Sequence, residues 1–143
     1  PRAHVLHVVR NPWSAYADTR KRPLPLSLDQ YMLAWTVNQY FAVVAQRQYP
    51  QRLHIVRLED ELADPLAALG PICRAVSVEP GPSLLKPSWN GQELEQVYPW
   101  GTIRTPTPEA NRATARELST AEREAVRLRA GAYLEHFDYV DFI

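Results

Sequence analysis

Cysteine and long apolar runs are scarce in this chain of 143 residues. Its one cysteine, Cys73, excludes an internal disulfide framework and a cysteine-rich zinc site. No apolar run approaches the roughly 18 residues that a membrane-spanning helix needs, and no segment has the pattern of a signal peptide. The sequence therefore predicts neither a membrane span nor a secretory leader.

An excess of either charge is also missing, since sixteen basic and sixteen acidic residues cancel. Proteins that bind nucleic acid or an anionic membrane usually carry a strongly basic surface. The balance of charges therefore excludes a basic surface that could bind nucleic acid, and only local basic pockets remain possible. Fourteen of the sixteen basic residues are arginine, which indicates a GC-rich genome, and we expect a cytoplasmic, bacterial protein.

The composition itself, 45% hydrophobic and 22% charged, is typical of one packed domain. Residues 4–9 and 53–58 are short, apolar, β-branched runs of the kind that form buried parallel strands. Each run is followed by a helical segment, and this alternation predicts an α/β domain with parallel strands. Because two strands alone make a weak sheet, we expect further strands in a missing N-terminal portion.

Polar caps and prolines predict where the helices begin, because side-chain oxygens satisfy the first free N–H groups and proline suits the first turn. These signals predict helices over 13–19 and 28–48, a helix capped by Asp64, a short helix after Thr107 and a helix from Ser119 to about 135. Residues 77–91 are rich in proline, glycine and serine, which predicts an irregular arm that lies over the domain. The tail 137–143 is aromatic and apolar, and we expect it to dock on the domain.

Apolar stripes predict which helix faces are buried. In the long helix the stripe consists of Leu28, Met32, Trp35, Phe41, Ala42 and Ala45. In the last helix it consists of Ala125, Val126, Leu128, Ala132 and Tyr133. We expect core or rim positions for Trp13, Trp35 and Trp89, and a buried position for Cys73.

The end of the first strand, Val8-Val9-Arg10-Asn11-Pro12, carries the strongest functional signal. Ligands of open α/β sheets bind beyond the carboxyl ends of the strands, where a starting helix offers free N–H groups and a positive dipole end. The planar fork of Arg10 at this point predicts an anion site, most naturally for a phosphate. The alternative, which the local pattern leaves open, is a salt bridge from Arg10 to a carboxylate such as Glu59 or Asp60.

The order of the motifs resembles the family of sulfotransferases that use 3′-phosphoadenosine 5′-phosphosulfate (PAPS). That family has a strand ending in Arg-x-Pro, then a strand followed by an acidic pair and an Asp-Pro-capped helix. The matching segments here are Arg10-Asn11-Pro12, Leu58-Glu59-Asp60, Asp64-Pro65 and Leu118-Ser119-Thr120-Ala121-Glu122. The resemblance implies a P-loop-type, three-layer α/β fold with a helix-rich C-terminal part. Residues 1–143 would then be the C-terminal part of one sulfotransferase domain that lacks its N-terminal phosphosulfate loop.

The resemblance also implies which residues bind the nucleotide. Arg10 is expected to bind the 3′-phosphate of PAPS. The family places a serine hydroxyl eight residues later, where this chain has Asp18, whose carboxylate repels a phosphate. Thr19 is the candidate that supplies the hydroxyl instead, Ser14 is a weaker substitute, and an ordinary helical role for Thr19 is the alternative.

A late loop of the family closes over the nucleotide, and its counterpart here is residues 100–104. Trp100 is expected to stack on adenine, Gly101 lets backbone approach a phosphate, and Arg104 adds charge, with Thr102 between them. The alternative is a plain surface turn with a docked tryptophan. Two further positions bear on the resemblance: Leu58 stands where the family often has a tyrosine against the adenine, and Glu59 with Asp60 is interpreted as a structural pair.

The parts of the family's site that perform the chemistry are not recognised in the sequence. With five glycines the chain shows no glycine-rich phosphate loop. The family's phosphosulfate loop and its histidine or glutamate base precede the Arg-x-Pro strand, so the catalytic residues are expected in the missing part. The 143-residue chain alone is therefore expected to be inactive. The histidines lack metal-ligand spacing, and no metal is expected.

The sequence thus predicts a fragment of a PAPS-dependent sulfotransferase. The complete enzyme would transfer a sulfuryl group to a hydroxyl or amine of a small-molecule or carbohydrate acceptor and release adenosine 3′,5′-bisphosphate. One alternative is another P-loop-type nucleotide-binding enzyme, such as a small kinase, which needs ATP and Mg²⁺. A second is a non-catalytic interaction module that retains the fold, which Asp18 and Leu58 favour. The sequence leaves the acceptor and the oligomeric state open.

Overall fold

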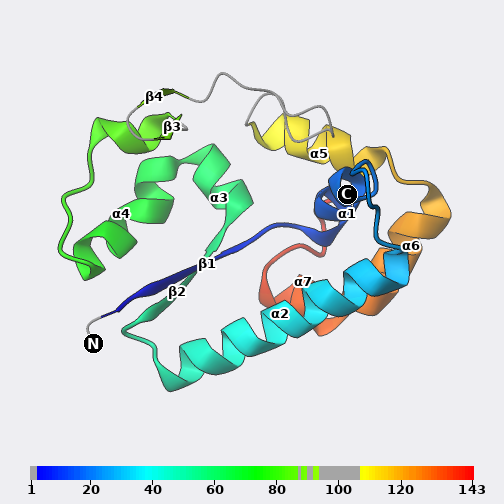
Figure 1. Ribbon diagram of the computed structural model, residues 1–143, viewed down its shortest axis with the longest axis horizontal. Helices are drawn as coiled ribbons and strands as arrows, with labels where there is room; N and C mark the ends of the chain where they lie inside the picture. Colours follow the sequence, from blue (N-terminus) through cyan, green and yellow to red (C-terminus); the bar gives the residue numbers. More distant parts are fainter. Residues whose placement is uncertain (1–2, 87, 90–91, 94–106) are drawn as a thin grey trace.

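The computed structural model describes residues 3–86, 88–89, 92–93 and 107–143 (Figure 1). It begins with β1 (Val5–Val9), α1 (Pro12–Thr19), α2 (Leu28–Gln48), β2 (Leu53–Arg57), α3 (Leu58–Ala63) and α4 (Pro65–Ala75). It continues with the 3₁₀ turn η1 (Pro82–Leu85), the short strands β3 (Ser88–Trp89) and β4 (Gln92–Glu93), and the helices α5 (Pro108–Arg116), α6 (Thr120–Ala130) and α7 (Ala132–His136). The chain is therefore of mixed α/β class.

A parallel pair of strands, β1 and β2, forms the centre of the fold. In its register His7 lies opposite Ile55 and Val8 lies opposite Val56. Figure 1 shows α2 along one side of the strands and α3 with α4 along the other. The pairing confirms the predicted parallel strands, but the prediction that the first run is buried was wrong, since Val5, Leu6 and Val8 of β1 are each about half exposed. Because the strands are parallel, the residues that follow them, Arg10 and the start of α3, lie at the same edge of the sheet.

The predicted helix caps are present. Ser27 accepts a hydrogen bond from the backbone N–H of Gln30, and the Gln30 side chain accepts one from the N–H of Ser27, which completes the capping box. Each such contact satisfies N–H groups that the first helical turn leaves free. Similar side-chain caps begin α4, α5 and α6 at Asp64, Thr107 and Ser119.

The buried face of α2 differs from the predicted stripe at one aromatic residue. Phe41 is 63% exposed, so its assignment to the stripe was wrong. The buried residues are Met32, Trp35, Gln39 and Ala42, which follow each other at intervals of three or four residues. Gln39 belongs to this face because its side-chain oxygen lies 2.8 Å from Nε2 of His7 on β1, which satisfies a polar group that burial otherwise penalises.

The last predicted helix is two helices, α6 and α7. Gly131 interrupts it with a φ of 47°, a left-handed conformation that glycine adopts without a Cβ clash. Leu128 and Ala132, both predicted to be buried, are exposed. Leu128 lies off the buried face of α6, which Val126 and Ala130 define, and Ala132 follows the break. Leu58 was predicted as the last residue of a strand but is the first residue of α3.

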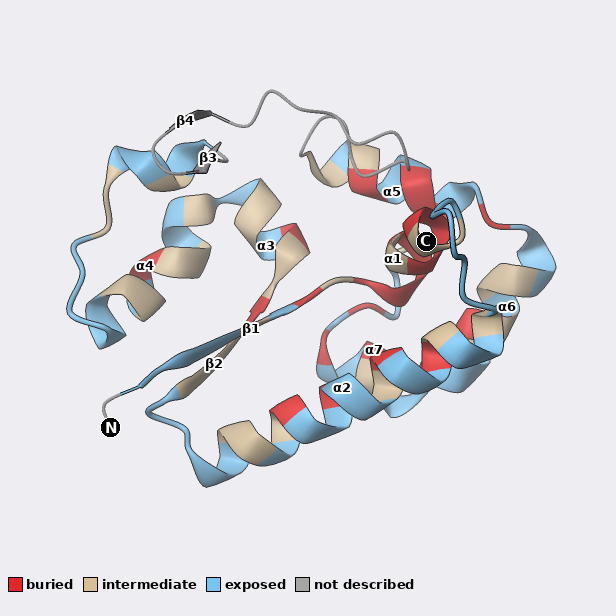
Figure 2. Ribbon diagram, in the orientation of Figure 1, coloured by how far each residue is buried: buried red, intermediate tan, exposed pale blue. Residues whose placement is uncertain are grey.

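The core gathers where the carboxyl end of β1 meets α1, α5, α6 and the C-terminal tail (Figure 2). Trp13 and Tyr139 are fully buried there, and the ring of Phe142 stacks over Trp13 with centroids 6.4 Å apart. The predictions that the tail docks and that Trp13 and Trp35 are core residues are confirmed. Cys73 is only half-buried, and the side chain of Trp89 lies outside the described residues.

Candidate functional site

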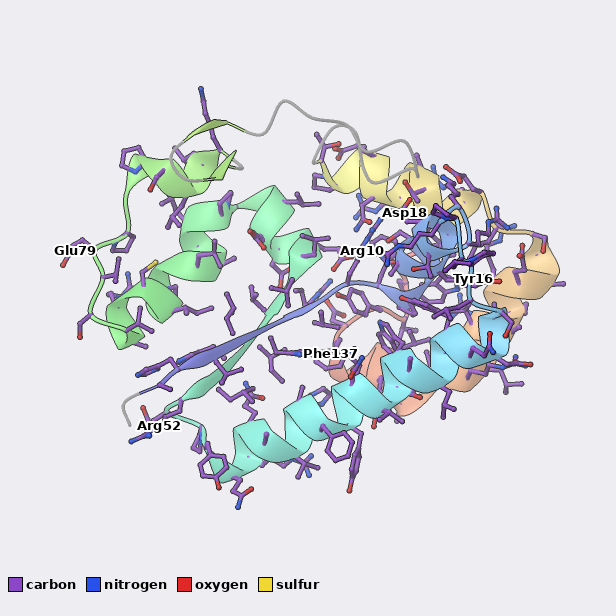
Figure 3. All side chains as sticks on the ribbon, in the orientation of Figure 1. Arg10, Tyr16, Asp18, Arg52, Glu79 and Phe137 are labelled. Atoms are coloured by element: carbon purple, nitrogen blue, oxygen red, sulfur yellow. The ribbon has the colours of Figure 1, made fainter. Side chains whose placement is uncertain are left out.

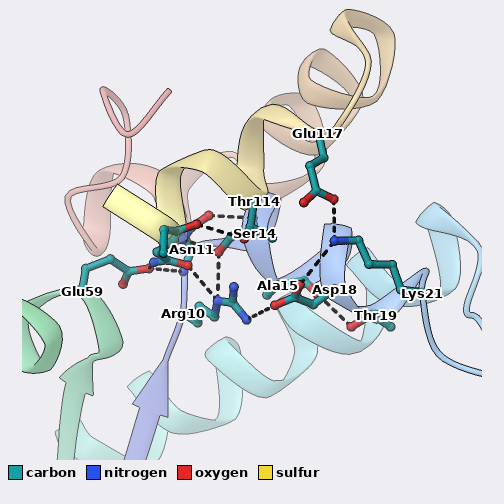
Figure 4. Close-up of polar contacts among 12 residues, drawn as sticks. Arg10, Asn11, Ser14, Ala15, Asp18, Thr19, Lys21, Glu59, Thr114 and Glu117 are labelled. Atoms are coloured by element: carbon teal, nitrogen blue, oxygen red, sulfur yellow. Dashed lines mark hydrogen bonds and ion pairs between the residues drawn. The ribbon is translucent and has the colours of Figure 1, made fainter. Parts of the chain in front are cut away.

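Arg10 lies directly after β1 and turns its side chain along α1 (Figures 3 and 4). Its backbone carbonyl accepts a hydrogen bond from the indole N–H of Trp35 at 3.1 Å, which ties the end of the strand to α2. Its Nε donates to Ser14 Oγ at 2.9 Å and to Asn111 Oδ1 at 3.0 Å. The Nε side of the guanidinium is thus held by α1 and α5.

The salt-bridge partner of Arg10 is Asp18, one of the predicted site residues. Arg10 Nη1 lies 2.7 Å from Asp18 Oδ2, and the Asp18 side chain is only 8% exposed. The alternative prediction of a salt bridge was therefore right about the interaction and wrong about the partner, since it named Glu59 or Asp60. Arg10 and Asp18 meet because the eight-residue helix α1 brings its last turn alongside the end of β1.

Burial and charge act in opposite directions on Asp18. Burial raises the pKa of this carboxyl, while the neighbouring Arg10 guanidinium and, more weakly, Lys21 lower it, and the net direction is upward. Lys21 Nζ lies 3.9 Å from Asp18 Oδ1 and also contacts Glu117. The carboxyl is therefore easier to protonate than an aspartate in water.

Glu59, a residue of α3, places its carboxylate against the start of α1. Its Oε1 accepts hydrogen bonds from the backbone N–H of Asn11 at 3.1 Å, from Asn11 Nδ2 at 2.6 Å and from Asn111 Nδ2 at 2.7 Å. The Asn11 side chain in turn caps Ser14 N–H. The helix start was predicted to offer free N–H groups to an anion, but Glu59 and Asn11 already use two of them. The N–H groups of Asn11 and Ser14 are therefore not free to bind a phosphate.

Tyr139 and Asn111 complete this buried network, and the sequence reasoning missed both. The Tyr139 hydroxyl donates to Glu59 Oε2 at 2.6 Å, and burial, together with the Glu59 charge, raises the pKa of Tyr139. The interpretation of Glu59 as structural fits this arrangement, and Asp60 pairs with Arg57 at 3.7 Å. The sequence did carry a signal for Asn111, because it lies inside a short predicted helix. Asparagine is unfavourable in a helix interior unless its side chain has a specific partner.

A cavity of about 420 Å³ opens on the α2 side of Arg10. Cationic, aromatic, amide and hydroxyl groups from α1, α2 and the loop between them share its wall. The lining residues are Arg10, Ala15, Asp18, Thr19, Arg22, Leu26, Tyr31, Ala34, Trp35, Asn38 and Gln39. Three predicted site residues, Arg10, Asp18 and Thr19, are thus brought to one cavity.

Two polar atoms at this wall are left unsatisfied by the part of the chain that the structure describes. Arg10 Nη2 is a buried donor and Asp18 Oδ1 a buried acceptor, and neither has a hydrogen-bond partner among those residues. Buried polar atoms are nearly always hydrogen-bonded, so such a pair calls for an explanation. Both atoms are buried beneath the cavity wall, so a ligand group in the cavity would supply the missing partners only after the Arg10 and Asp18 side chains shift.

Thr19 lines the cavity but its hydroxyl is occupied. Thr19 Oγ1 donates to the carbonyl of Ala15 at 2.8 Å, the contact expected of an ordinary helical threonine. Ser14 Oγ accepts hydrogen bonds from Arg10 Nε and from Asn11 Nδ2. Both hydroxyls are therefore engaged, and the donor nitrogen of Arg10 that lacks a hydrogen-bond partner among the described residues is Nη2.

A second cavity, of about 480 Å³, lies beside the end of β2. Its cation, Arg57, is paired with Asp138 at 3.2 Å and with Asp60 at 3.7 Å. Two carboxylates against one guanidinium make this cavity a poor site for an anion. The Arg10 cavity is therefore the candidate functional site.

The predicted loop residues Trp100, Gly101, Thr102 and Arg104 lie outside the described residues. Within the described ranges no group of three or more histidine, cysteine, aspartate or glutamate side chains is arranged to hold a metal ion. The helices of those same ranges include none that is long and apolar enough to cross a membrane.

Fold and site together define a class: an α/β chain with an arginine-lined cavity beyond the carboxyl end of a parallel strand. Comparison with protein-family models, with curated proteins and with solved structures found no match to this chain. The function is therefore argued from the residues of the cavity.

Proposed function

We propose that this chain is the nucleotide-binding, C-terminal part of a sulfotransferase domain that uses PAPS. The observation that carries the proposal is Arg10, which lies beyond the carboxyl end of β1 and lines a cavity of about 420 Å³. Its Nη2 is buried and has no hydrogen-bond partner among the described residues. A phosphate oxygen accepts the hydrogen bond that Nη2 has free, and planar bidentate donors suit phosphate well. The resemblance of the flanking motifs points to the 3′-phosphate of PAPS.

The other residues of the cavity fit a nucleotide in part. Arg22 adds a second positive charge, and Tyr31 and Trp35 supply aromatic surface beside it. Asp18 opposes a fully ionised phosphate, so it must share a proton with the ligand or move away. When bound, PAPS would supply an activated sulfuryl group for transfer to an acceptor hydroxyl or amine. This chain would hold and orient the 3′-phosphate end, and we assign no catalytic residue within it.

The test compares two nucleotides in wild type and Arg10→Ala. Adenosine 3′,5′-bisphosphate carries the 3′-phosphate, and adenosine 5′-monophosphate lacks it. A hydrogen bond to a charged group is worth about 1.5–3 kcal/mol, so the variant should lose roughly 10–100-fold in affinity for the bisphosphate and change little for the monophosphate. Arg10→Lys should recover only part of the loss, because an ammonium lacks the planar fork. Isothermal titration calorimetry of the purified protein measures both affinities.

Arg47→Ala is the matched control, because Arg47 is an exposed arginine in the last turn of α2 and does not line the cavity. It should bind both nucleotides as wild type does. Equal losses for both nucleotides in Arg10→Ala would show that Arg10 only supports the fold through Asp18. Tight binding of ATP with Mg²⁺, with no preference for a 3′-phosphate, would favour a kinase.

The second candidate is a non-catalytic interaction module, and the Arg10–Asp18 ion pair favours it. At 2.7 Å the carboxylate already neutralises the guanidinium that a nucleotide would need. A module of this kind would be folded and would bind none of the nucleotides in the titration above. The same experiment therefore separates the two candidates.

A further inference from the structure

Arg10 and Asp18 line the cavity, are joined to each other, and each carry one buried polar atom without a hydrogen-bond partner among the described residues. Both atoms are buried beneath the cavity wall, and Lys21 Nζ lies 3.9 Å from the one on Asp18, so a ligand reaches them only when these side chains shift. Arg10 Nη1 and Asp18 Oδ2 form the ion pair at 2.7 Å, which leaves Arg10 Nη2 as the donor and Asp18 Oδ1 as the acceptor. A ligand group complementary to this pair must accept one hydrogen bond and donate another. A fully deprotonated phosphate or sulfate can only accept.

A phosphate oxygen that carries a hydrogen meets this requirement. It donates to Asp18 Oδ1, and a second, bare oxygen of the same phosphate accepts from Arg10 Nη2. The second proton of a phosphomonoester leaves near pH 6, so taking it up again near neutral pH is inexpensive. Sulfate remains a dianion throughout this range and would place its charge against the buried carboxylate.

We propose that Asp18 makes the cavity selective for a phosphomonoester that binds with one proton shared between a phosphate oxygen and Asp18 Oδ1, so that sulfate is rejected. This inference rests on the proposed function, because it assumes that the phosphate is the 3′-phosphate of a nucleotide at Arg10. When the dianion binds, one proton from solvent forms an O–H bond on a phosphate oxygen, this hydrogen is donated to Asp18 Oδ1, and no other covalent bond changes. Asp18 thereby becomes a specificity-determining residue that the resemblance to the sulfotransferases does not supply.

The charged groups around Asp18 are compatible with a shared proton. Arg10 approaches from the end of β1, Lys21 from the turn after α1, and Glu117 from the turn after α5, where it holds Lys21. The α2 side contributes Tyr31, and Arg22 lies in the loop before it. Burial outweighs the two nearest cations and raises the Asp18 pKa, which favours keeping a proton at this carboxyl.

The first measurement is the number of protons taken up when adenosine 3′,5′-bisphosphate binds. Calorimetric titrations at pH 7.5, in buffers of different ionisation enthalpy, give this number directly. Wild type should take up about one proton, and its affinity should weaken by about tenfold per pH unit between pH 7 and 8.5. Asp18→Asn should take up close to none and keep its affinity over the same range, since the amide donates to the dianion without a proton from solvent.

The second measurement is competition by two inorganic anions. Inorganic phosphate should displace the bisphosphate from wild type, whereas sulfate at the same concentration should not. In Asp18→Asn the two anions should compete to a similar extent. Asp18→Ser is the second variant, and at pH 8 it should bind the bisphosphate more tightly than wild type does.

Glu117→Gln is the matched control, because Glu117 is a carboxylate that contacts Lys21 outside the cavity lining. It should retain the proton uptake and the sulfate rejection of wild type. Circular dichroism spectra check that each variant is folded. If Asp18→Asn does not fold, proton uptake and anion competition in wild type and in Asp18→Ser still decide the matter.

The outcomes separate this inference from the proposed function. Arg10-dependent binding of the bisphosphate without proton uptake, or with sulfate competing as well as phosphate in wild type, overturns the role of Asp18 and leaves the nucleotide site standing. Absence of any binding that needs a 3′-phosphate overturns both. One proton taken up by wild type and none by Asp18→Asn supports both.

Discussion

Glu59 and Asp18 are both buried carboxylates, yet their surroundings differ. Both oxygens of Glu59 accept hydrogen bonds, from Asn11, Asn111 and Tyr139. Asp18 has one oxygen on Arg10 and one without a hydrogen-bond partner among the described residues. A fully satisfied buried network rigidifies the structure, whereas a half-satisfied buried carboxylate is costly until a further partner is supplied. Glu59 therefore holds elements together, and Asp18 faces the site.

At this scale, Tyr139→Phe should destabilise the fold by about 1.5–3 kcal/mol, because it removes a donor to a buried carboxylate. It should also reduce the loss of stability at alkaline pH. The pKa of Tyr139 is raised in the folded state, so its contribution is fully present below about pH 10 and is lost as the pH rises above that value. Urea unfolding followed between pH 7 and 11 measures both effects.

Tyr40→Phe provides the comparison, since the Tyr40 side chain is 54% exposed on α2. It should change neither the unfolding midpoint at pH 7 nor the alkaline slope by a measurable amount. An unchanged midpoint in Tyr139→Phe would mean that the hydrogen bond to Glu59 contributes little to stability.

The helices illustrate how one face is selected for burial. In α2, positions 32, 35, 39 and 42 face the core, at the spacing expected of one side of a helix. Gln39 is the polar member of this face and is paired with His7, while the more hydrophobic Phe41 is exposed. Position on the helix therefore outweighed hydrophobicity at these two residues.

The test at this scale compares two residues of α2. Met32 is 1% exposed, so Met32→Ala should cost about 2–5 kcal/mol through lost burial and the cavity left behind. Phe41→Ala, although it removes a larger side chain, should stay within about 0.5 kcal/mol of wild type, because most of that side chain is in water. Chemical denaturation compares the two, and a loss of several kcal/mol in Phe41→Ala would show that its face is covered in solution.

At the scale of the whole molecule, the exposed part of β1 stands out. Val5, Leu6 and Val8 are each about half exposed, and within the described residues β1 pairs with β2 alone. An apolar strand with an open edge favours pairing with another chain. The 143-residue chain should therefore self-associate at high concentration.

Leu6→Lys should shift the chain toward the monomer, because a charge on an edge strand opposes pairing between chains. Leu24→Lys is the same chemical change at a residue that is 88% exposed in the loop between α1 and α2, and it should leave self-association as in wild type. Sedimentation velocity distinguishes the species. A wild-type chain that stays monomeric at all concentrations would contradict this expectation.

The helix starts and the parallel pairing were predictable from the sequence. The cap at Ser27 joins residues three positions apart, and Asp64 with Pro65 likewise acts within one turn, so such signals are complete in a short stretch of sequence. The position of Arg10 at the end of a strand was predictable for the same reason. The break at Gly131 had a local signal as well, a glycine inside a helical pattern, which the predicted helix to about 135 passed over.

Only the tertiary structure decided which groups satisfy Arg10, Glu59 and Gln39. Asn111 reaches Arg10 across 101 positions, Tyr139 reaches Glu59 across 80, and His7 reaches Gln39 across 32. Burial makes a polar group bond to whichever complementary group packing brings within about 3 Å. That proximity depends on how all the helices and strands pack together, and the spacing of residues along the chain does not contain it.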